Sequence, residues 1–475
     1  LAGVDPADVG LRASALSRAD LYIDLPGGEV VSVPGALQGS IANGIEQITF
    51  DAVYGTTWTT ADMRARIVAA QEADGAPVLR GFSDTDTLTA TVDGQRLTGF
   101  DGSDTYVVDG SVGFATVLDD GSFDTDVLFL PDHLPDAVTF FTRAAARNDL
   151  WVQLGDWDGL GAHPPNGVRL RDVMDASAVN QIEVVRFADG SELAIEAIRQ
   201  TLIDAQTSAG DDDILGWATA DTLTGGAGDD ILRGGDGSDT YLHVIGDGTT
   251  RVIDGGAFDT DVLRIIGVAA ADVRFAQDTL DRSDLIITFD GLGDRIVIEN
   301  TLYGELATQI ERIEILPAAG AEVETSWDMN AVRARLLAGM ATPGDDVVRG
   351  FGGNEVITGG AGDDHLIGEL GSDTYVYVVG TDGDDVIEDL GAYENDRVQL
   401  QGVAPGDVTV TQDLFNPDTV VLTFAGQPGS LTLANGLGGF PSNIEEVLFD
   451  DGTVWDTATL SSVAVVPPTV TVPGT

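Results

Sequence analysis

The chain has 475 residues, of which 43% are hydrophobic. It is too long for one ordinary core and apolar enough to bury several, so we expect several domains or a repeat array. Its 79 acidic residues outnumber 23 basic residues, all of them arginine, and give a formal net charge of −56. A compact chain with this charge repels itself unless cations neutralise it. The charge also argues against nucleic acid as a partner, because the nucleic-acid backbone is an anion too.

Two further classes of structure are excluded by composition. Cysteine is absent, which rules out disulfides and thiolate metal sites. No apolar run has the length that a membrane span requires. A chain without disulfides needs another stabilising crosslink, and a bound metal ion can supply one.

The sequence repeats itself with a long period. At offsets of 135 and 134 residues, the string Gly-Ser-Asp-Thr-Tyr occurs at 102–106, 237–241 and 371–375. An Ile-Glu pair followed by an apolar run recurs at 45–46, 182–183, 310–311 and 444–445. Repetition of this kind predicts a tandem array.

Four repeat units account for most of the chain. Residues 1–71 match the back of a first unit, a β-rich region plus a helix, and Leu1 lies in the middle of the pattern, so we expect a piece of a longer protein. Residues 462–475 have the composition of a linker. Each of the other units is predicted to be a block of nonapeptides followed by a β-rich region. They cover 72–206 (block 72–107, β-rich 108–206), 207–340 (block 207–242, β-rich 243–340) and 341–461 (block 341–376, β-rich 377–461).

Short strands and two helices are predicted within these units. Segments such as 284–289 and 295–298 are rich in β-branched residues and have a period near two, which favours strands. Residues 60–68 and 329–337 are predicted helices, each with an Asp near its start and two Arg further along. Both stand just before a nonapeptide block. We expect them to cap the open end of that block, where apolar surface and strand edges would otherwise be exposed.

The nonapeptides carry the chemistry. Residues 225–242 form two copies of G-G-x-G-x-D-x-U-x, where U is a large apolar residue, and 207–215 and 216–224 are looser copies in the same phase. The glycines allow positive φ and bring carbonyls close together, while U points inward from a very short strand. Carboxylate and carbonyl oxygens at such a turn suit Ca²⁺, which takes six to eight hard ligands.

These blocks resemble the RTX nonapeptide family, also called hemolysin-type calcium-binding repeats, and the segments after them resemble its associated β-rich regions. In that family two nonapeptides form one coil of a right-handed parallel β-roll, and calcium lies between nonapeptides n and n+2. The resemblance implies an all-β fold. We expect tandem calcium-binding parallel β-rolls, each followed by a β-rich sandwich-like or solenoid-like region, with short capping helices.

The resemblance also implies a set of ligands, with Ca²⁺ as the cofactor at about five or more sites. Paired carboxylates are expected at Asp86 with Asp104, Asp212 with Asp230, Asp221 with Asp239, Asp346 with Asp364, and Glu355 with Asp373. Backbone carbonyls are expected from Gly225, Gly228, Gly234, Gly237, Gly359, Gly362 and Gly371. Weaker candidates beyond the blocks are Asp126, Asp261 and Asp396. On the other side of the second unit, Pro77 and Gln95 stand at the ligand positions, and no calcium is predicted there.

Other chemistries find little support. The Gly-x-Gly strings are followed by further Gly/Asp-rich sequence rather than by a helix, which argues against a dinucleotide-binding site. The four His residues are far apart, and His365 is expected on the surface. No nucleophile elbow or zinc-protease motif occurs, so no catalytic residue is assigned and an enzyme is not expected. Trp151, Trp157 and Trp217 can form a carbohydrate platform, but such residues more often belong to the core. The loop 156–165 is a candidate for a contact specific to the second unit.

The function expected from these features is that of an extracellular, bacterial calcium-binding structural or adhesive protein. The resemblance implies export unfolded through a type I channel, followed by folding on calcium. We expect a component of an adhesin, surface layer or filament, with itself, a cell surface or a glycan as partner. Two alternatives stay open: the calcium-folding region of a larger secreted enzyme or toxin, and a glycan-binding module.

Overall fold

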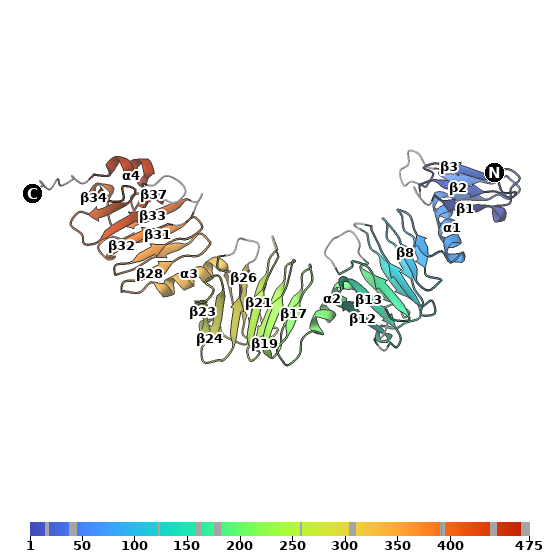
Figure 1. Cartoon of the computed structure of the whole chain (residues 1–475), viewed down its shortest axis with the longest axis horizontal. Coiled ribbons are helices and arrows are strands. Elements are labelled where there is room, and N and C mark those ends of the chain that lie inside the picture. Colours follow the sequence, from blue (N-terminus) through green and yellow to red (C-terminus); the bar gives the residue numbers. More distant parts are fainter. Residues whose placement is uncertain are drawn as a thin grey trace, which may run out of the picture. The chain divides into compact units, whose positions relative to one another are not determined.

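A computed structural model describes the chain from residue 1 to 466, except for 15–18, 38–44, 122–123, 158, 160–162, 175–181, 257–258, 304–309, 390, 392–394 and 438–443. The chain divides into an N-terminal part, Leu1–Ala205, and a C-terminal part, Gln206–Thr475 (Figure 1). Each part is described by itself, and the repeat units serve as names for regions within them. No helix among the described residues is long and apolar enough to cross a membrane.

The first unit, in the N-terminal part, holds antiparallel sheets and a helix. One sheet is formed by β1 (Gly10–Ala13), β2 (Leu21–Asp24) and β3 (Val30–Val33), and a hairpin by β4 (Gln47–Thr49) and β5 (Thr57–Thr59). Helix α1 (Thr60–Ala73) follows, and its N-terminus is closed by a capping box between Thr59 and Asp62. This helix confirms the one predicted at 60–68.

Each of the three fuller units contains one six-stranded and one five-stranded sheet. In the second unit the six-stranded order is β12 (Val138–Arg143), β13 (Ala146–Leu154), β14 (Gly167–Leu170), β10 (Phe114–Val117), β8 (Gln95–Thr98) and β6 (Val78–Arg80). The five-stranded order is β16 (Glu192–Ala194), β15 (Val184–Phe187), β11 (Val127–Leu130), β9 (Thr105–Val107) and β7 (Thr87–Thr89). Helix α2 (Ile195–Asp204) ends the unit.

The third unit repeats this order in the C-terminal part. Its six-stranded sheet runs β17 (Asp213–Leu215), β19 (Gly228–Arg233), β21 (Gly248–Ile253), β25 (Arg295–Ile298), β24 (Leu285–Phe289), β23 (Val273–Gln277). Its five-stranded sheet runs β18 (Thr222–Thr224), β20 (Thr240–Val244), β22 (Val262–Ile266), β26 (Arg312–Leu316), β27 (Thr325–Asp328), and helix α3 (Met329–Met340) follows.

The fourth unit has the same two sheets. The six-stranded sheet runs β28 (Val347–Arg349), β30 (His365–Ile367), β32 (Asp384–Glu388), β36 (Ser430–Ala434), β35 (Val420–Phe424), β34 (Val408–Gln412). The five-stranded sheet runs β29 (Val356–Thr358), β31 (Thr374–Val378), β33 (Asp396–Gln401), β37 (Ile444–Phe449), β38 (Val454–Asp456), and helix α4 (Thr457–Val463) follows.

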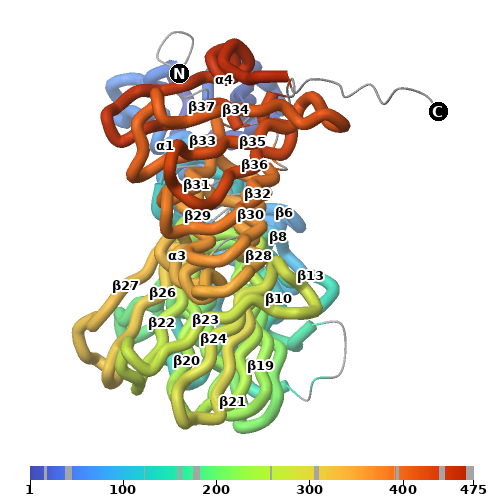
Figure 2. The backbone as a smooth tube through the Cα atoms, turned by 90° about the vertical axis from the view of Figure 1, so that its left-hand side faces the viewer, coloured from blue at the N-terminus to red at the C-terminus, as the bar shows by residue number. Residues whose placement is uncertain are grey.

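The pairing of these strands confirms an all-β fold built on parallel rolls. Successive nonapeptide strands alternate between the two sheets, so each pairs in parallel with the strand two nonapeptides later, as β17 does with β19 and β18 with β20. The β-rich region continues the same sheets through further parallel strands, such as β21 on β19 and β22 on β20. An antiparallel hairpin on one sheet and a single antiparallel strand on the other then end the unit. Roll and β-rich region therefore share sheets and are not packed as separate layers; Figure 2 shows the stacked strands of the C-terminal part.

The interior of each roll is lined by the U residues. All twelve are at most 1% exposed: Leu79, Leu88, Leu97, Tyr106, Ile214, Leu223, Leu232, Tyr241, Val348, Ile357, Leu366 and Tyr375. This confirms the phase of the nonapeptides, because a shift by one residue would have turned each of these side chains outward.

Two features of the unit ends differ from the sequence expectation. Helices α2 and α4 were not predicted; α2 lacks a side-chain N-cap, and α4, although capped by Asp456, is only seven residues long. The first residues of the linker expected from 462 form regular structure. Helix α4 extends to Val463, and Val465 forms a parallel bridge with Thr411 of β34. The last residues of that linker, 467–475, lie outside the described residues.

A buried arginine on each of two helices joins a repeat unit to the block after it. Arg333 of α3 is 4% exposed; its Nη2 donates to the Thr301 carbonyl oxygen at 3.5 Å, and its Nε lies 3.9 Å from Oε1 of Glu355 in the fourth block. Arg64 of α1 donates to the Leu37 carbonyl oxygen at 2.7 Å and pairs with Asp84 of the second block at 2.5 Å. The helices therefore contact the next roll as expected, and a fixed protein cation faces that roll's first turns.

Replacing Arg333 with Met should weaken this junction. The change removes the buried protein cation beside Glu355 and its hydrogen bond to the Thr301 carbonyl oxygen, and we expect the free energy of unfolding to fall by about 2 kcal/mol, measured by urea denaturation in calcium. Arg335 is the matched control, because its exposed guanidinium lies 4.9 Å from the Trp327 ring centre in the same helix. The Arg335→Met change should cost under about 1 kcal/mol. Equal losses in the two variants would contradict the role given to Arg333.

Candidate metal centre

Each nonapeptide acid of the second coil accepts a hydrogen bond from the acid one coil earlier. The backbone N–H of the earlier acid donates to Oδ1 of the later one, over a separation of 18 residues and at 2.7 to 2.9 Å. This brings together all five carboxylate pairs expected from the sequence: Asp86/Asp104, Asp212/Asp230, Asp221/Asp239, Asp346/Asp364 and Glu355/Asp373. The acids thus stack in ladders along the roll.

The ladders continue beyond the nonapeptide blocks. Asp104, Asp239 and Asp373 donate their N–H groups to Oδ1 of Asp126, Asp261 and Asp396 at 2.7 to 2.8 Å. These three acids, the weaker candidates of the sequence, therefore form the third rung. Their own N–H groups donate at 2.6 Å to a fourth rung that the sequence analysis did not assign: Glu183, Glu311 and Glu445. Each is the Glu of a recurring Ile-Glu pair, and that repetition was the signal available for finding it.

On the other side of the fourth unit one more acid was missed. The N–H of Asp364 donates to Oδ1 of Asp385 at 3.0 Å, so this ladder also has a third rung. In the third unit the strand residue paired with Asp230 in the next coil is Thr250, so the ladder that contains Asp212 and Asp230 has no third acid. Asp385 follows Gly383 and Asp384, and a Gly followed closely by Asp was its available signal.

First-coil and second-coil acids differ in the hydrogen bonding of their second carboxylate oxygen. In first-coil acids it accepts from the backbone N–H four residues earlier, as Asp212 does from Ser208 at 2.6 Å and Asp346 from Thr342 at 2.6 Å. In second-coil acids Oδ2 has no hydrogen-bond partner among the described residues, although the side chains are at most 2% exposed. This holds for all five: Asp104, Asp230, Asp239, Asp364 and Asp373. A buried, unpaired carboxylate oxygen is costly, and a cation would satisfy it.

The glycines make room at these oxygens. A Cβ on Gly225, Gly234 or Gly359 would lie 2.0 to 2.2 Å from Oδ2 of the acid in its own nonapeptide. The fourth-position glycines stack on the previous coil instead; Gly237, at φ 110°, would place a Cβ 2.4 Å from the Thr219 carbonyl carbon, and the same approach is made by Gly228, Gly362 and Gly371. Hard oxygens and an unmet carboxylate charge together fit Ca²⁺. That these residues and carbonyls bind calcium stays a prediction.

The second unit has one side without acids. Gln95 is fully buried there, its Oε1 accepts from the Thr91 N–H at 2.7 Å, and its Nε2 donates to the Ala76 carbonyl oxygen at 2.6 Å. Its neutral amide uses both ends on protein partners. The prediction that no calcium lies between these two turns therefore keeps a physical basis.

Burial sets the electrostatics of the ladders. It raises the pKa of Asp104, Asp239 and Asp373 to about 9, with neighbouring carboxylates adding to the effect. It raises the pKa of Asp126 to about 8, and of Asp261 and Asp385 to about 7. In the absence of metal, these groups hold protons near neutral pH. A bound divalent cation favours the ionised forms and displaces the protons.

Comparisons with known proteins point the same way. A family model for the RTX calcium-binding nonapeptide repeat, in four copies, matches residues 206–241 and 340–376. The chain carries RTX calcium-binding nonapeptide repeats. A model of the haemolysin-type calcium binding protein related domain matches residues 420–459, in the β-rich region of the fourth unit. RTX repeats bind Ca²⁺ and indicate a secreted calcium-binding protein.

One solved structure and the curated proteins complete the comparison. The crystal structure of extracellular lipase LipA from Serratia marcescens is 21% identical, with a TM-score of 0.19. The match covers 48% of this chain and 38% of the lipase chain, and a likeness this slight carries no argument about function. No curated protein matches the chain.

The remaining sequence candidates lie mostly in the core. Trp151 and Trp217 are 7% and 6% exposed, which leaves little ring surface for a sugar. Trp157 is half-buried and stacks on Phe141 at 5.7 Å between ring centres. Part of the loop 156–165, namely 158 and 160–162, lies outside the described residues. His365, expected on the surface, is half-exposed and pairs with Glu388 at 3.1 Å.

In chelator, the RTX rolls should lose stability as pH rises. The folded-state pKa of the ladder acids lies above the unfolded value, so the folded chain binds more protons than the unfolded chain between about pH 4 and 9. We expect the circular-dichroism β-signal in EGTA to be stronger at pH 5.5 than at pH 8. In millimolar calcium the two pH values should give equal signals. More β-structure at pH 8 than at pH 5.5 in the calcium-free chain would show that stability does not fall with rising pH, and would contradict the prediction.

Proposed function

We propose that the chain is an extracellular structural or adhesive protein that folds on calcium, as part of an adhesin, surface layer or filament, and that it is not an enzyme. The observation that carries the proposal is the recurrence, at equivalent positions in three tandem units, of buried carboxylate oxygens that lack a hydrogen-bond partner among the described residues. Tandem recurrence extends a scaffold, whereas catalysis needs one distinct pocket.

A need for calcium would restrict folding of this scaffold to places where calcium is abundant. Extracellular calcium modules bind at roughly 10⁻⁴ to 10⁻³ M, so such sites are empty in a low-calcium cytosol and filled outside. Without the ion, the clustered acids repel and the glycine-rich turns carry a high ordering entropy. Binding free energy then becomes folding free energy, which suits export of an unfolded chain.

Two apolar hairpin tips support an adhesive or self-assembling role. Leu280, between β23 and β24, is 97% exposed, and Phe415, in the matching turn between β34 and β35, is 96% exposed. Two units therefore present a bare apolar side chain at the same place in the fold. A single exposed apolar side chain is common on protein surfaces, so the support for a contact role comes from its recurrence at the same turn.

Sedimentation velocity and electron microscopy in millimolar calcium test the proposal. We expect ordered assemblies that dissolve in EGTA. A Leu280→Ser/Phe415→Ser double variant should assemble more weakly, since it removes the two exposed tips. Val53→Ser is the control, because Val53 is 83% exposed but lies outside these hairpins. A discrete monomer at every protein concentration in calcium would overturn the proposal.

A further inference from the structure

In each full unit an aspartate stands at a position that should be apolar. Strands β10, β21 and β32 point alternate residues inward, ending with Val117, Val252 and Ile387, which are at most 1% exposed. The next inward position, two residues on, is occupied by an aspartate in all three units: Asp119, Asp254 and Asp389. Asp119 and Asp389 are 2% and 3% exposed, and Asp254 is half-buried. A carboxylate that is buried at the same core position in three units needs hydrogen-bond donors or a cation as partners.

Part of that partner is a buried tyrosine. The hydroxyl of Tyr106 donates to Asp119 at 2.6 Å, that of Tyr241 to Asp254 at 2.7 Å, and that of Tyr375 to Asp389 at 3.2 Å. Each is the last residue of the repeated Gly-Ser-Asp-Thr-Tyr string. The other oxygen accepts a backbone N–H two residues on, from Gly121, Gly256 and Gly391 respectively. These bonds fix the orientation of the carboxylate without neutralising its charge.

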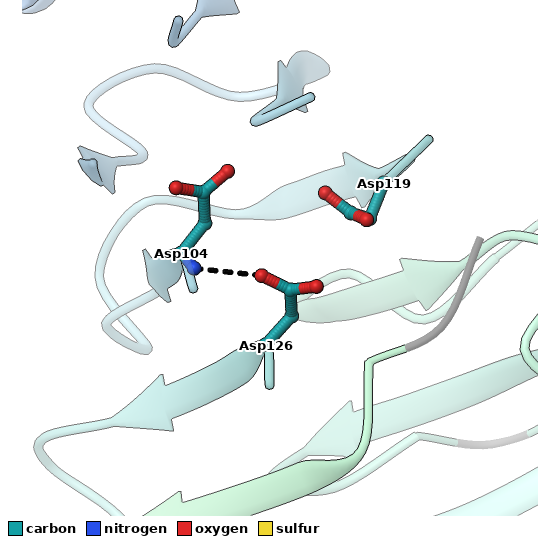
Figure 3. A group of neighbouring side chains, drawn as sticks. All are labelled: Asp104, Asp119 and Asp126. Carbon is teal, nitrogen blue, oxygen red and sulfur yellow. Dashed lines mark hydrogen bonds between the residues drawn. The ribbon is translucent and has the colours of Figure 1, made fainter. Parts of the chain in front are cut away.

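The inward aspartate completes a cluster of three carboxylates. Asp104, Asp119 and Asp126 each place one oxygen within 4.8 Å of the others, and Figure 3 shows the three side chains with the bond from the Asp104 N–H to Asp126. The same cluster recurs in the other full units, as Asp239, Asp254, Asp261 and as Asp373, Asp389, Asp396. Its members come from the second and third coils, so it lies beyond the paired turns of the nonapeptide block.

Each cluster contains a buried aspartate with one oxygen that lacks a hydrogen-bond partner among the described residues. Oδ2 of Asp104, Asp239 and Asp373 has no hydrogen-bond partner in the described part of the chain, and these side chains are 1%, 0% and 0% exposed. A glycine without a Cβ allows these oxygens and the tyrosine hydroxyl to approach each other closely. A Cβ on Gly99 would lie 1.8 Å from Asp104 Oδ2 and 2.3 Å from the Tyr106 hydroxyl, and Gly234 and Gly368 are placed in the same way.

We propose that each full unit holds one buried calcium ion in this three-aspartate cluster, and that these are the tightest cation sites of the chain. The inference rests on the proposed calcium-dependent folding and adds sites at the junction between roll and β-rich region. Three carboxylates and a tyrosine-fixed ligand favour tighter binding than two carboxylates, because calcium affinity rises with ligand charge and site rigidity. Hard oxygens alone select Ca²⁺ or a lanthanide over zinc or copper.

Counting tightly bound calcium on the whole chain tests the proposal. Equilibrium dialysis at low micromolar free calcium should find three ions per chain, one for each cluster. The triple variant Asp119→Asn/Asp254→Asn/Asp389→Asn should lose all three. Its control removes the same charge from exposed acids, as Asp101→Asn/Asp236→Asn/Asp407→Asn, and should keep them. An unchanged count in the first variant would overturn the clusters alone, whereas a wild-type chain that binds no calcium would overturn the proposed function as well.

A gentler variant covers the case in which the triple aspartate variant fails to fold. Terbium at these sites should emit on excitation of the neighbouring tyrosines. Tyr106→Phe/Tyr241→Phe/Tyr375→Phe removes only the hydroxyl groups, and we expect the sensitised emission to fall by more than half. The control Tyr22→Phe/Tyr54→Phe, in the first unit, should leave the emission unchanged. Equal emission from both variants would place terbium away from the clusters and overturn the proposal.

Discussion

The structure depends on carboxylates stacked above one another at the turns of a coil. A step of 18 residues places each second-coil acid so that its Oδ1 accepts the N–H of the acid one coil earlier, and its Oδ2 stays buried with no hydrogen-bond partner among the described residues. Backbone hydrogen bonding alone does not offset the cost of such a column once the acids ionise, because every ionised rung adds a desolvated negative charge. A divalent cation between rungs changes the balance, since it converts the repulsion into coordination. The excess of acidic residues in the chain is consistent with a fold that requires cations.

The same constraint explains how the units are built. The β-rich regions extend the two sheets of the roll, so the ladder of acids passes into them through Asp126, Asp261 and Asp396 without a break. At the opposite end of the roll, α1 and α3 each bring an arginine to the first turns. Protein cations close the start of these rolls, and metal cations are inferred for the interior. The second and fourth units thus begin at a protein cation, and we infer that the body of each roll depends on calcium.

The sequence predicted the local features of this design well. The nonapeptide phase followed from glycine, acid and apolar residues at fixed spacing, and every U side chain from Leu79 to Tyr375 is buried as expected. The features that it missed involve long separations or a shift of phase. Asp119 follows an interruption of the nine-residue period, so its inward orientation depends on the register of β10. Glu183 lies 57 residues after Asp126, and the partner of Arg333 becomes visible only when α3 packs on the fourth block.

Hydrogen exchange in calcium and in EGTA tests the central claim most directly, because the amides of the first-coil acids donate straight into the ladders. The account predicts that peptides covering residues 207–242 and 341–376 are protected in calcium and exchange almost completely within seconds in EGTA at pH 8. It predicts the same loss for residues 243–266, which continue the ladder of the third unit. Protection of these peptides that is unchanged by chelation would show that the rolls hold without a cation, and would contradict the account.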